Sequence, residues 1–209
     1  MALIDRRLLL VALAALSLAA CNKGGAGASA DEMSMGDPKA KVTVIEYASV
    51  ACPICAEVNN TVFPEFKKKY IDTNKVHYVF REALTGNPSL AVAGFLLARC
   101  AGKDKYFQVT DAVFRAQEQI YEPGSENMRP QVGHDILLNI GKSVGVSEQQ
   151  FNTCMNDEKS ITALQDRVER LSKQYDVNAT PTFVINGKVM NRGAMSLAEL
   201  DAAIQPLLK

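Results

Sequence analysis

Residues 42–55, Val-Thr-Val-Ile-Glu-Tyr-Ala-Ser-Val-Ala-Cys-Pro-Ile-Cys, decide the fold of this chain. The first half of the stretch is apolar and rich in β-branched residues, which predicts a buried strand. Two cysteines, Cys52 and Cys55, follow in the spacing C-x-x-C. Pro53 suits the first turn of a helix, because its φ is already helical and its missing N–H would have no partner there. The stretch therefore predicts a strand, a turn, and a helix that begins at or just after Cys52.

The C-x-x-C spacing predicts a redox-active pair, because both sulfurs can approach within bonding distance across one helical turn. Cys52 would lie at the helix N-terminus, where unpaired N–H groups and the helix dipole stabilise a thiolate and lower its pKa. We expect Cys52 to be the nucleophile and the more shielded Cys55 to be the resolving thiol. Half of a zinc site or a structural disulfide is the alternative for a lone C-x-x-C. The surrounding strand, proline and helix favour a thioredoxin-like redox motif.

The composition is that of a globular protein. The 209 residues include 23 Lys and Arg and 23 Asp and Glu, so the formal net charge is zero, and 47% of residues are hydrophobic. This length allows one large domain or a core domain with an insertion. The balanced charge argues against a nucleic-acid partner.

The N-terminus has the pattern of an export signal. Arg6 and Arg7 precede an apolar run, residues 8–20, that is too short for a comfortable membrane span. Residues 18–21, Leu-Ala-Ala-Cys, resemble the lipobox of bacterial lipoprotein signal peptides, in which the cysteine is lipidated. We therefore expect a signal peptide over residues 1–21, with Cys21 as the lipidated mature N-terminus tethered to a membrane. An ordinary secretory signal is the alternative, and both versions place the protein in the periplasm, where disulfides persist.

Five cysteines is an odd number for an exported protein, and the leftover thiol needs an explanation. Assigning Cys21 to a lipid leaves four. The simplest arrangement is the redox pair Cys52/Cys55 and a structural disulfide between Cys100 and Cys154. Two buried free thiols at positions 100 and 154 remain the alternative.

Apolar periodicity divides the rest of the chain. Residues 22–36 are rich in Gly, Ala and Ser and predict a flexible tether, so that the fold begins at Asp37. A helix interrupted at Pro64 should run to about Tyr70, and a second strand should follow over residues 76–80.

A helical pattern fills residues 88–157, and a long helix should start near Lys159. A strand then leads into Asn186-Gly187, the strongest hairpin signal in the chain. A final helix should follow a capping box formed by Ser196 and Glu199. The predicted fold class is α/β, with a mixed central sheet flanked by helices and an inserted all-helical subdomain.

These features resemble the DsbA family of thioredoxin-fold thiol–disulfide oxidoreductases. The resemblance covers residues 37–209 and depends on the strand-Cys-Pro-x-Cys-helix unit, the helical insertion, and the late element Ala-Thr-Pro-Thr-Phe at 179–183. It implies a thioredoxin-fold domain over residues 37–87 and 158–209, interrupted by the insertion at 88–157. It also implies a cis Thr180–Pro181 bond beside the active-site pair. The residues expected to contact the substrate are Thr180, Pro181, Pro53 and Ile54.

Glu46 is an acidic residue on an otherwise apolar strand, six positions before Cys52. An edge-exposed carboxylate is one interpretation. The other is a buried acid of raised pKa beneath the disulfide that carries the proton of Cys55 during exchange. The DsbA family has an acidic residue at the matching position, so the resemblance implies the second role.

The function implied is oxidation of thiols in unfolded or partly folded exported proteins, with a membrane redox partner that recycles the disulfide. No cofactor beyond the Cys52–Cys55 disulfide and no metal is expected, and the protein should be a monomer. Ile54 replaces the histidine of the family's best-known oxidant and cannot donate a hydrogen bond to the Cys52 thiolate. A milder oxidant is therefore expected, since thiolate stability makes the disulfide oxidising.

Two other functions compete with the oxidase. An isomerase or reductase of the same fold would use the same pair in the opposite direction. A metal-binding lipoprotein would use Cys52, Cys55, Cys100 and Cys154 as a zinc site, but the sequence lacks the second close cysteine pair that such sites usually have.

Overall fold

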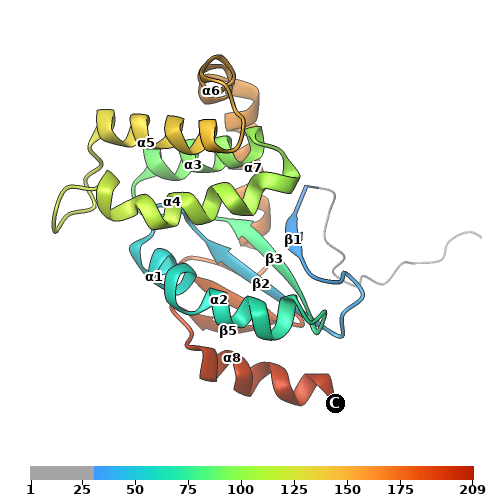
Figure 1. Ribbon diagram of the computed structural model, residues 1–209. Coiled ribbons are helices and arrows are strands. Elements are labelled where there is room, and N and C mark those ends of the chain that lie inside the picture. Colours follow the sequence, from blue (N-terminus) through green and yellow to red (C-terminus); the bar gives the residue numbers. More distant parts are fainter. Residues whose placement is uncertain (1–30) are drawn as a thin grey trace, which may run out of the picture.

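A computed structural model describes residues 31–209 of the chain (Figure 1). The predicted signal peptide over residues 1–21, the lipidation of Cys21 and most of the predicted tether lie outside the described residues. Within residues 31–209, none of the helices combines the length and the apolar character needed to cross a membrane.

A mixed five-stranded sheet forms the centre of the described part of the chain (Figure 1). The strands lie in the order β1-β3-β2-β4-β5, and β2 and β3 are parallel while the other pairs are antiparallel. Their bounds are β1 Met33–Met35, β2 Val42–Ala48, β3 Val76–Glu82, β4 Thr182–Ile185 and β5 Lys188–Arg192. All of β3, and β2 except Thr43, is buried, as expected for parallel strands covered on both faces.

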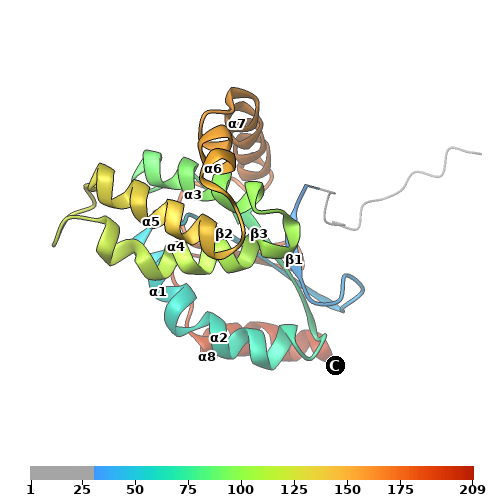
Figure 2. The same ribbon diagram turned by 45° about the horizontal axis from the view of Figure 1, so that its top comes forward.

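Helices cover both faces of the sheet. One face packs on α7 (Glu158–Lys173), with a small apolar cluster that includes Tyr47 and Leu171. The other face carries the main core and the segments α1 (Pro53–Thr61), α2 (Phe63–Phe66), the π-helix η1 (Lys67–Ile71), α8 (Leu197–Ile204) and the 3₁₀-helix η3 (Gln205–Leu208). In Figures 1 and 2, α8 runs beside α2 and η1.

The predicted insertion is a block of helices over one end of the sheet, at the top of Figure 1. The block contains α3 (Pro88–Cys100), η2 (Lys103–Lys105), α4 (Tyr106–Ile120), α5 (Pro130–Ser143) and α6 (Glu148–Met155). Helix α4 packs against α1, α3 and α5, so it joins the block to the first helix of the sheet domain. A disulfide joins Cys100 of α3 to Cys154 of α6. The structure thus has the bridge and not two free thiols.

Turn and cap signals in the sequence correctly located several element ends. Asn186 and Gly187 both have positive φ, 45° and 81°, and link β4 to β5 as the predicted hairpin. Ser196 forms the predicted capping box with Glu199 at the start of α8.

The predicted tether over residues 22–36 is too long at its C-terminal end, because residues 33–35 belong to the folded domain. Met33–Met35 form the edge strand β1, which pairs antiparallel with β3. Two side chains explain this: Met33 is buried in the core, and the Glu32 carboxylate accepts a 2.6 Å bond from Arg81 in a buried ion pair. The ordered fold therefore begins several residues before Asp37.

Candidate active site

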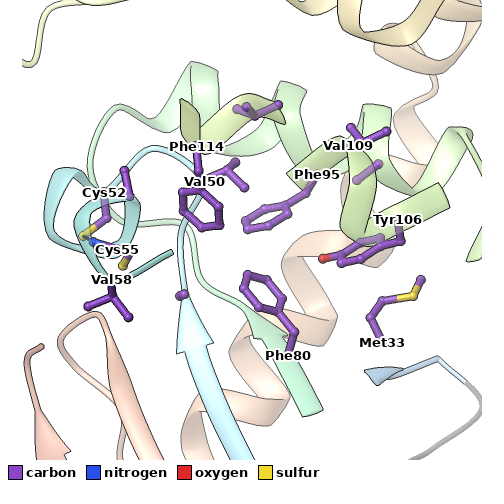
Figure 3. Close-up of a cluster of buried hydrophobic side chains, with 14 of the residues drawn as sticks. Met33, Val50, Cys52, Cys55, Val58, Phe80, Phe95, Tyr106, Val109 and Phe114 are labelled. Atoms are coloured by element: carbon purple, nitrogen blue, oxygen red, sulfur yellow. Dashed lines mark hydrogen bonds between the residues drawn. The ribbon is translucent and has the colours of Figure 1, made fainter. Parts of the chain in front are cut away.

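Cys52 lies at the position immediately before α1, as predicted. Its backbone is extended, with φ −92° and ψ 120°, and its Sγ accepts a 3.3 Å hydrogen bond from the Cys55 N–H. Pro53 occupies the first turn. Both cysteines are free thiols in the structure, and Cys52 is 7% exposed whereas Cys55 is completely buried. Figure 3 shows the two sulfurs at one end of the apolar cluster that continues through Phe114.

The two thiols have opposite pKa shifts. The pKa of Cys52 is lowered to about 6, first because the Cys55 thiol hydrogen-bonds to it, and further by the Thr180 side chain and two N–H groups of the helix start. Burial opposes this shift. The pKa of Cys55 is strongly raised by burial and by the neighbouring Cys52 thiolate. At neutral pH the pair is therefore one thiolate and one thiol, which is the state needed for disulfide exchange.

The late proline element lies beside Cys52. The Thr180–Pro181 bond is cis, and the Cys52 Sγ lies 3.7 Å from the Thr180 carbonyl oxygen. Sheet topology brings the two together: β4 pairs antiparallel with β2, so that Thr182 lies opposite Tyr47 near the carboxyl end of β2. The resemblance to DsbA proteins implied this arrangement, and the structure has it.

Glu46 is buried on β2, only 5% exposed, and the edge-exposed interpretation is wrong. Its Oε2 accepts a 2.7 Å hydrogen bond from the Tyr78 hydroxyl. Burial raises the pKa of Glu46 to about 7, the Cys52 charge adds to the rise, and the Tyr78 hydrogen bond opposes it. A cavity of about 310 Å³ reaches this carboxyl group between α2 and α4, with Phe63 and Asp111 in its lining.

The turn before α1 is held by one side chain of α4, Gln117, and by Tyr121, the residue that directly follows this helix. The Gln117 Nε2 donates to the carbonyls of Val50 and Cys52, at 2.6 and 3.3 Å, and the Tyr121 hydroxyl donates to Ala51 at 2.6 Å. Neither role has a local signal in the sequence, because the carbonyl groups that accept these bonds lie 65 to 70 residues away along the chain. The only sequence feature that could have indicated these roles is a polar side chain, Gln117, on the buried face of an amphipathic helix, with Tyr121 directly after it.

The surface beside Cys52 contains the other predicted substrate contacts. Pro53 is exposed and Ile54 is 48% exposed, so Ile54 is a large apolar side chain available to a partner.

The zinc alternative lacks its ligands. Cys100 and Cys154 are bonded to each other, so neither offers a thiolate to a metal. Within residues 31–209, no three or more His, Cys, Asp or Glu side chains gather as a metal site would require.

Comparison with known proteins identifies the relatives of this chain. A family model described as Thioredoxin matches residues 28–206. A Rickettsia conorii protein with the provisional name protein-disulfide oxidoreductase is 32% identical over 179 residues, which cover 86% of this chain and 61% of that protein. Disulfide bond formation protein D of Bacillus subtilis is 24% identical over 175 residues, covering 84% of this chain and 76% of the relative.

The crystal structure of Wolbachia pipientis alpha-DsbA1 is similar in fold, with a TM-score of 0.72 and 25% identity. The similarity covers 87% of this chain and 92% of that one. By contrast, this chain spans less than two thirds of the Rickettsia conorii relative. The predicted thioredoxin fold with a helical insertion is confirmed. The chain therefore belongs to the thioredoxin family, and within it the fold is similar to that of the DsbA protein of Wolbachia pipientis.

Proposed function

We propose that the chain is a protein-disulfide oxidoreductase that exchanges disulfides through Cys52 and Cys55. The observation that carries the proposal is the opposite shift of the two pKa values, which favours a Cys52 thiolate at neutral pH beside a buried Cys55 thiol. The names of the Rickettsia conorii and Bacillus subtilis relatives support the same chemistry. The exchange itself needs no bound cofactor, because the Cys52–Cys55 disulfide accepts the two electrons.

The proposed oxidation begins with the Cys52–Cys55 disulfide. A substrate thiolate attacks Cys52 Sγ, a mixed disulfide forms, and the bond to Cys55 breaks, so that Cys55 leaves as a thiolate and takes up a proton. A second substrate thiolate then attacks the substrate sulfur, forms the substrate disulfide and releases Cys52 as a thiolate. The substrate loses two electrons and the protein pair gains them, and a membrane redox partner returns the pair to the disulfide.

Glu46 is the proposed carrier of the Cys55 proton. Its pKa of about 7 lies near neutral pH, so the carboxyl group can give and recover a proton with little free-energy change. The charge of Cys52 contributes to that pKa, so the acid and the pair interact. Glu46 would then protonate the Cys55 thiolate as it leaves and remove that proton when the disulfide reforms.

The proposed substrates of the protein are unfolded or partly folded exported proteins. Thr180 and Pro181 would align the substrate backbone beside Cys52, while Pro53 and Ile54 would contact its side chains. The protein would act as a monomer in the periplasm, tethered through a lipid on Cys21, or soluble there if the signal is an ordinary secretory one.

The direction of transfer separates the oxidase from the isomerase or reductase. A pKa of about 6 for Cys52 lies nearer to the ~7 of thioredoxin than to the ~3.5 of the most oxidising DsbA. This supports the milder oxidant expected from Ile54. The reduction potential of the pair tests it: a value near about −120 mV favours the oxidase and one near about −270 mV favours the reductase.

The test of the function compares wild type, Cys52→Ser and Cys55→Ser in the oxidation of a reduced two-cysteine peptide and in insulin reduction. Cys52→Ser should abolish both activities, because it removes the attacked sulfur. Cys55→Ser should lose turnover in both assays and, when given insulin, accumulate a mixed disulfide between Cys52 and insulin that is visible by mass spectrometry, because the Cys52 thiolate can attack the insulin disulfide but Cys55 is no longer there to release it. Retained turnover in Cys52→Ser would refute the proposal.

A further inference from the structure

A groove runs from the active-site turn along α1. It has a volume of about 960 Å³ and lies between α1, α4 and the residues that follow α4. Both Pro53 and Thr61, the first and last residues of α1, line it. The two helices are antiparallel, since Tyr121 donates to the turn before α1 whereas Asp111 accepts a 3.0 Å bond from Asn59 near its end. In Figures 1 and 2, α1 lies beneath the last part of α4.

The groove combines apolar lining with negative charge. Ala56 and Phe114 contribute buried apolar surface, at 7% and 3% exposure. The exposed side chains of Glu57, Glu118 and Glu122 also line it, one from α1 and two from the end of α4 and the loop behind it. The whole chain has a formal net charge of zero, so this is a local concentration of negative charge.

These three carboxylates have no cation of the protein to neutralise them. Within residues 31–209, none of the three takes part in an ion pair, and the single cationic side chain that lines the groove, Arg115, is paired with Asp111 at 3.0 Å. Glu118 lies in the last turn of α4 and Glu122 four residues later, where the helix dipole and the like charge both disfavour a carboxylate. A cationic ligand in the groove would relieve both effects.

We propose that this groove binds a Lys- or Arg-rich segment of the substrate polypeptide while the adjoining substrate cysteine reacts at Cys52. The inference rests on the proposed function, and it names the kind of substrate that this site prefers. Pro53, which is exposed beside Cys52, lines the groove, so the groove continues directly from the reacting sulfur.

The spread of the carboxylates fits an extended chain better than a single ion. In the part of the chain that the structure describes, no three acidic, His or Cys side chains gather as a metal site would require. The nine residues of α1 span about 13 Å, which is the length of about four residues of extended chain. The cationic side chains should therefore lie within about four residues of the substrate cysteine.

The experiment measures binding of cysteine-free peptides to full-length protein by fluorescence anisotropy. A serine replaces the reactive cysteine, and the four residues on either side of it are all Lys in one peptide and all Gln in the other. We expect the Lys peptide to bind wild type roughly tenfold more tightly at low salt, because three exposed charge pairs contribute about twofold each. This preference should largely disappear at about 1 M salt, where the Debye length is about 3 Å.

The groove variant is Glu57→Gln/Glu118→Gln/Glu122→Gln, in which the preference for the Lys peptide should fall below about twofold. It changes exposed side chains alone, so its urea unfolding should match that of wild type. A preference below twofold in wild type, or one that the groove variant keeps, overturns the proposal.

A matched control removes the same charge elsewhere. Glu158→Gln/Asp166→Asn/Glu169→Gln changes three exposed side chains of α7, on the other face of the sheet, and should keep the tenfold preference. Equal losses in the control and the groove variant would assign the preference to the overall charge of the protein and overturn a role for the groove.

Binding and exchange together separate this inference from the proposed function. If wild type exchanges disulfides but binds both peptides equally, the groove inference alone fails. If wild type prefers the Lys peptide through the three glutamates but exchanges no disulfides, the proposed function fails and the groove stands as a site for basic peptides.

Discussion

At the scale of single residues, position in the fold gives identical groups different chemistry. Cys52 and Cys55 are both thiols three residues apart, yet Cys52 lies at the helix start with a small part of its surface exposed, whereas Cys55 lies one turn inside and is completely buried. Backbone N–H groups at the helix start stabilise the negative charge of Cys52 and lower its pKa, whereas burial away from water raises the pKa of Cys55. A single turn of helix therefore separates the sulfur that reacts from the sulfur that resolves.

Glu46 should make the stability of the reduced protein depend on pH. Its folded-state pKa of about 7 lies above the ordinary 4.5, so the folded state holds this proton more tightly than the unfolded state. The stabilisation is complete below about pH 4.5 and is lost as the pH rises to 7 and above, which amounts to roughly 3 kcal/mol at the alkaline end. Urea unfolding from pH 4.5 to 8.5 measures it.

Glu46→Gln is the matched variant for that measurement, because the amide keeps the shape and cannot titrate. We expect its stability to exceed that of wild type at pH 8 and the difference to vanish below pH 5. Equal pH dependence in both proteins would show that the carboxyl group does not carry the raised pKa.

The places of Cys52 and Cys55 could be predicted because the C-x-x-C spacing and Pro53 are local signals. The burial of Glu46 was one of two interpretations, and the resemblance to DsbA proteins favoured it. Tyr78 and Gln117 could not be predicted, since each acts on a residue at least 32 positions away. Nothing in the local sequence around these residues distinguishes them from other strand or helix residues. They reach the site because β3 pairs with β2 and because α4 packs against α1.

At the scale of elements, α4 positions the active-site turn. Gln117→Leu should destabilise the protein by about 1 to 3 kcal/mol, because it leaves the buried carbonyl groups of Val50 and Cys52 without this donor. Gln119→Leu is the matched control: the same change on the same helix, at an exposed side chain, should cost less than about 0.5 kcal/mol. Urea unfolding of the two variants compares them, and equal losses would contradict a role for α4 in holding the turn.

The disulfide between α3 and α6 should stabilise the helical block without taking part in exchange. Its sequence separation of 54 corresponds to about 4 kcal/mol in the chain-entropy estimate. We expect Cys100→Ala/Cys154→Ala to lose up to that amount in urea unfolding while it still oxidises the reduced peptide. Loss of peptide oxidation in a variant that remains folded would instead assign the bridge to the reaction.

Helices and the hairpin were predictable at this scale because periodicity and caps are local. The edge strand β1 was missed because three residues carry little periodic signal. Its pairing depends on Glu32 meeting Arg81, a residue 49 positions further along the chain. The helix break was expected at Pro64 and occurs at Val62, with α2 starting at Phe63, since proline is accepted within the first turn of a new helix.

At the scale of the whole molecule, one buried carboxylate connects the helical block to the sheet. Glu82 ends β3 and is 3% exposed. It accepts bonds of 2.6 and 2.9 Å from Arg99 of α3, 3.2 Å from Arg167 of α7 and 3.0 Å from the Tyr106 hydroxyl of α4. Three helices therefore share a single anionic partner at the end of a central strand.

Glu82→Gln should accordingly be among the most damaging single changes outside the active site. The amide keeps the shape but removes the negative charge, so the largely buried guanidinium groups of Arg99 and Arg167 lose their counter-ion, at a cost of roughly 3 kcal/mol or more. Glu169→Gln provides the control, because its pair with Lys173 is exposed and should be worth less than about 1 kcal/mol. Urea unfolding decides between them: a loss in Glu82→Gln no larger than in Glu169→Gln would mean that apolar packing alone holds the helices on the sheet.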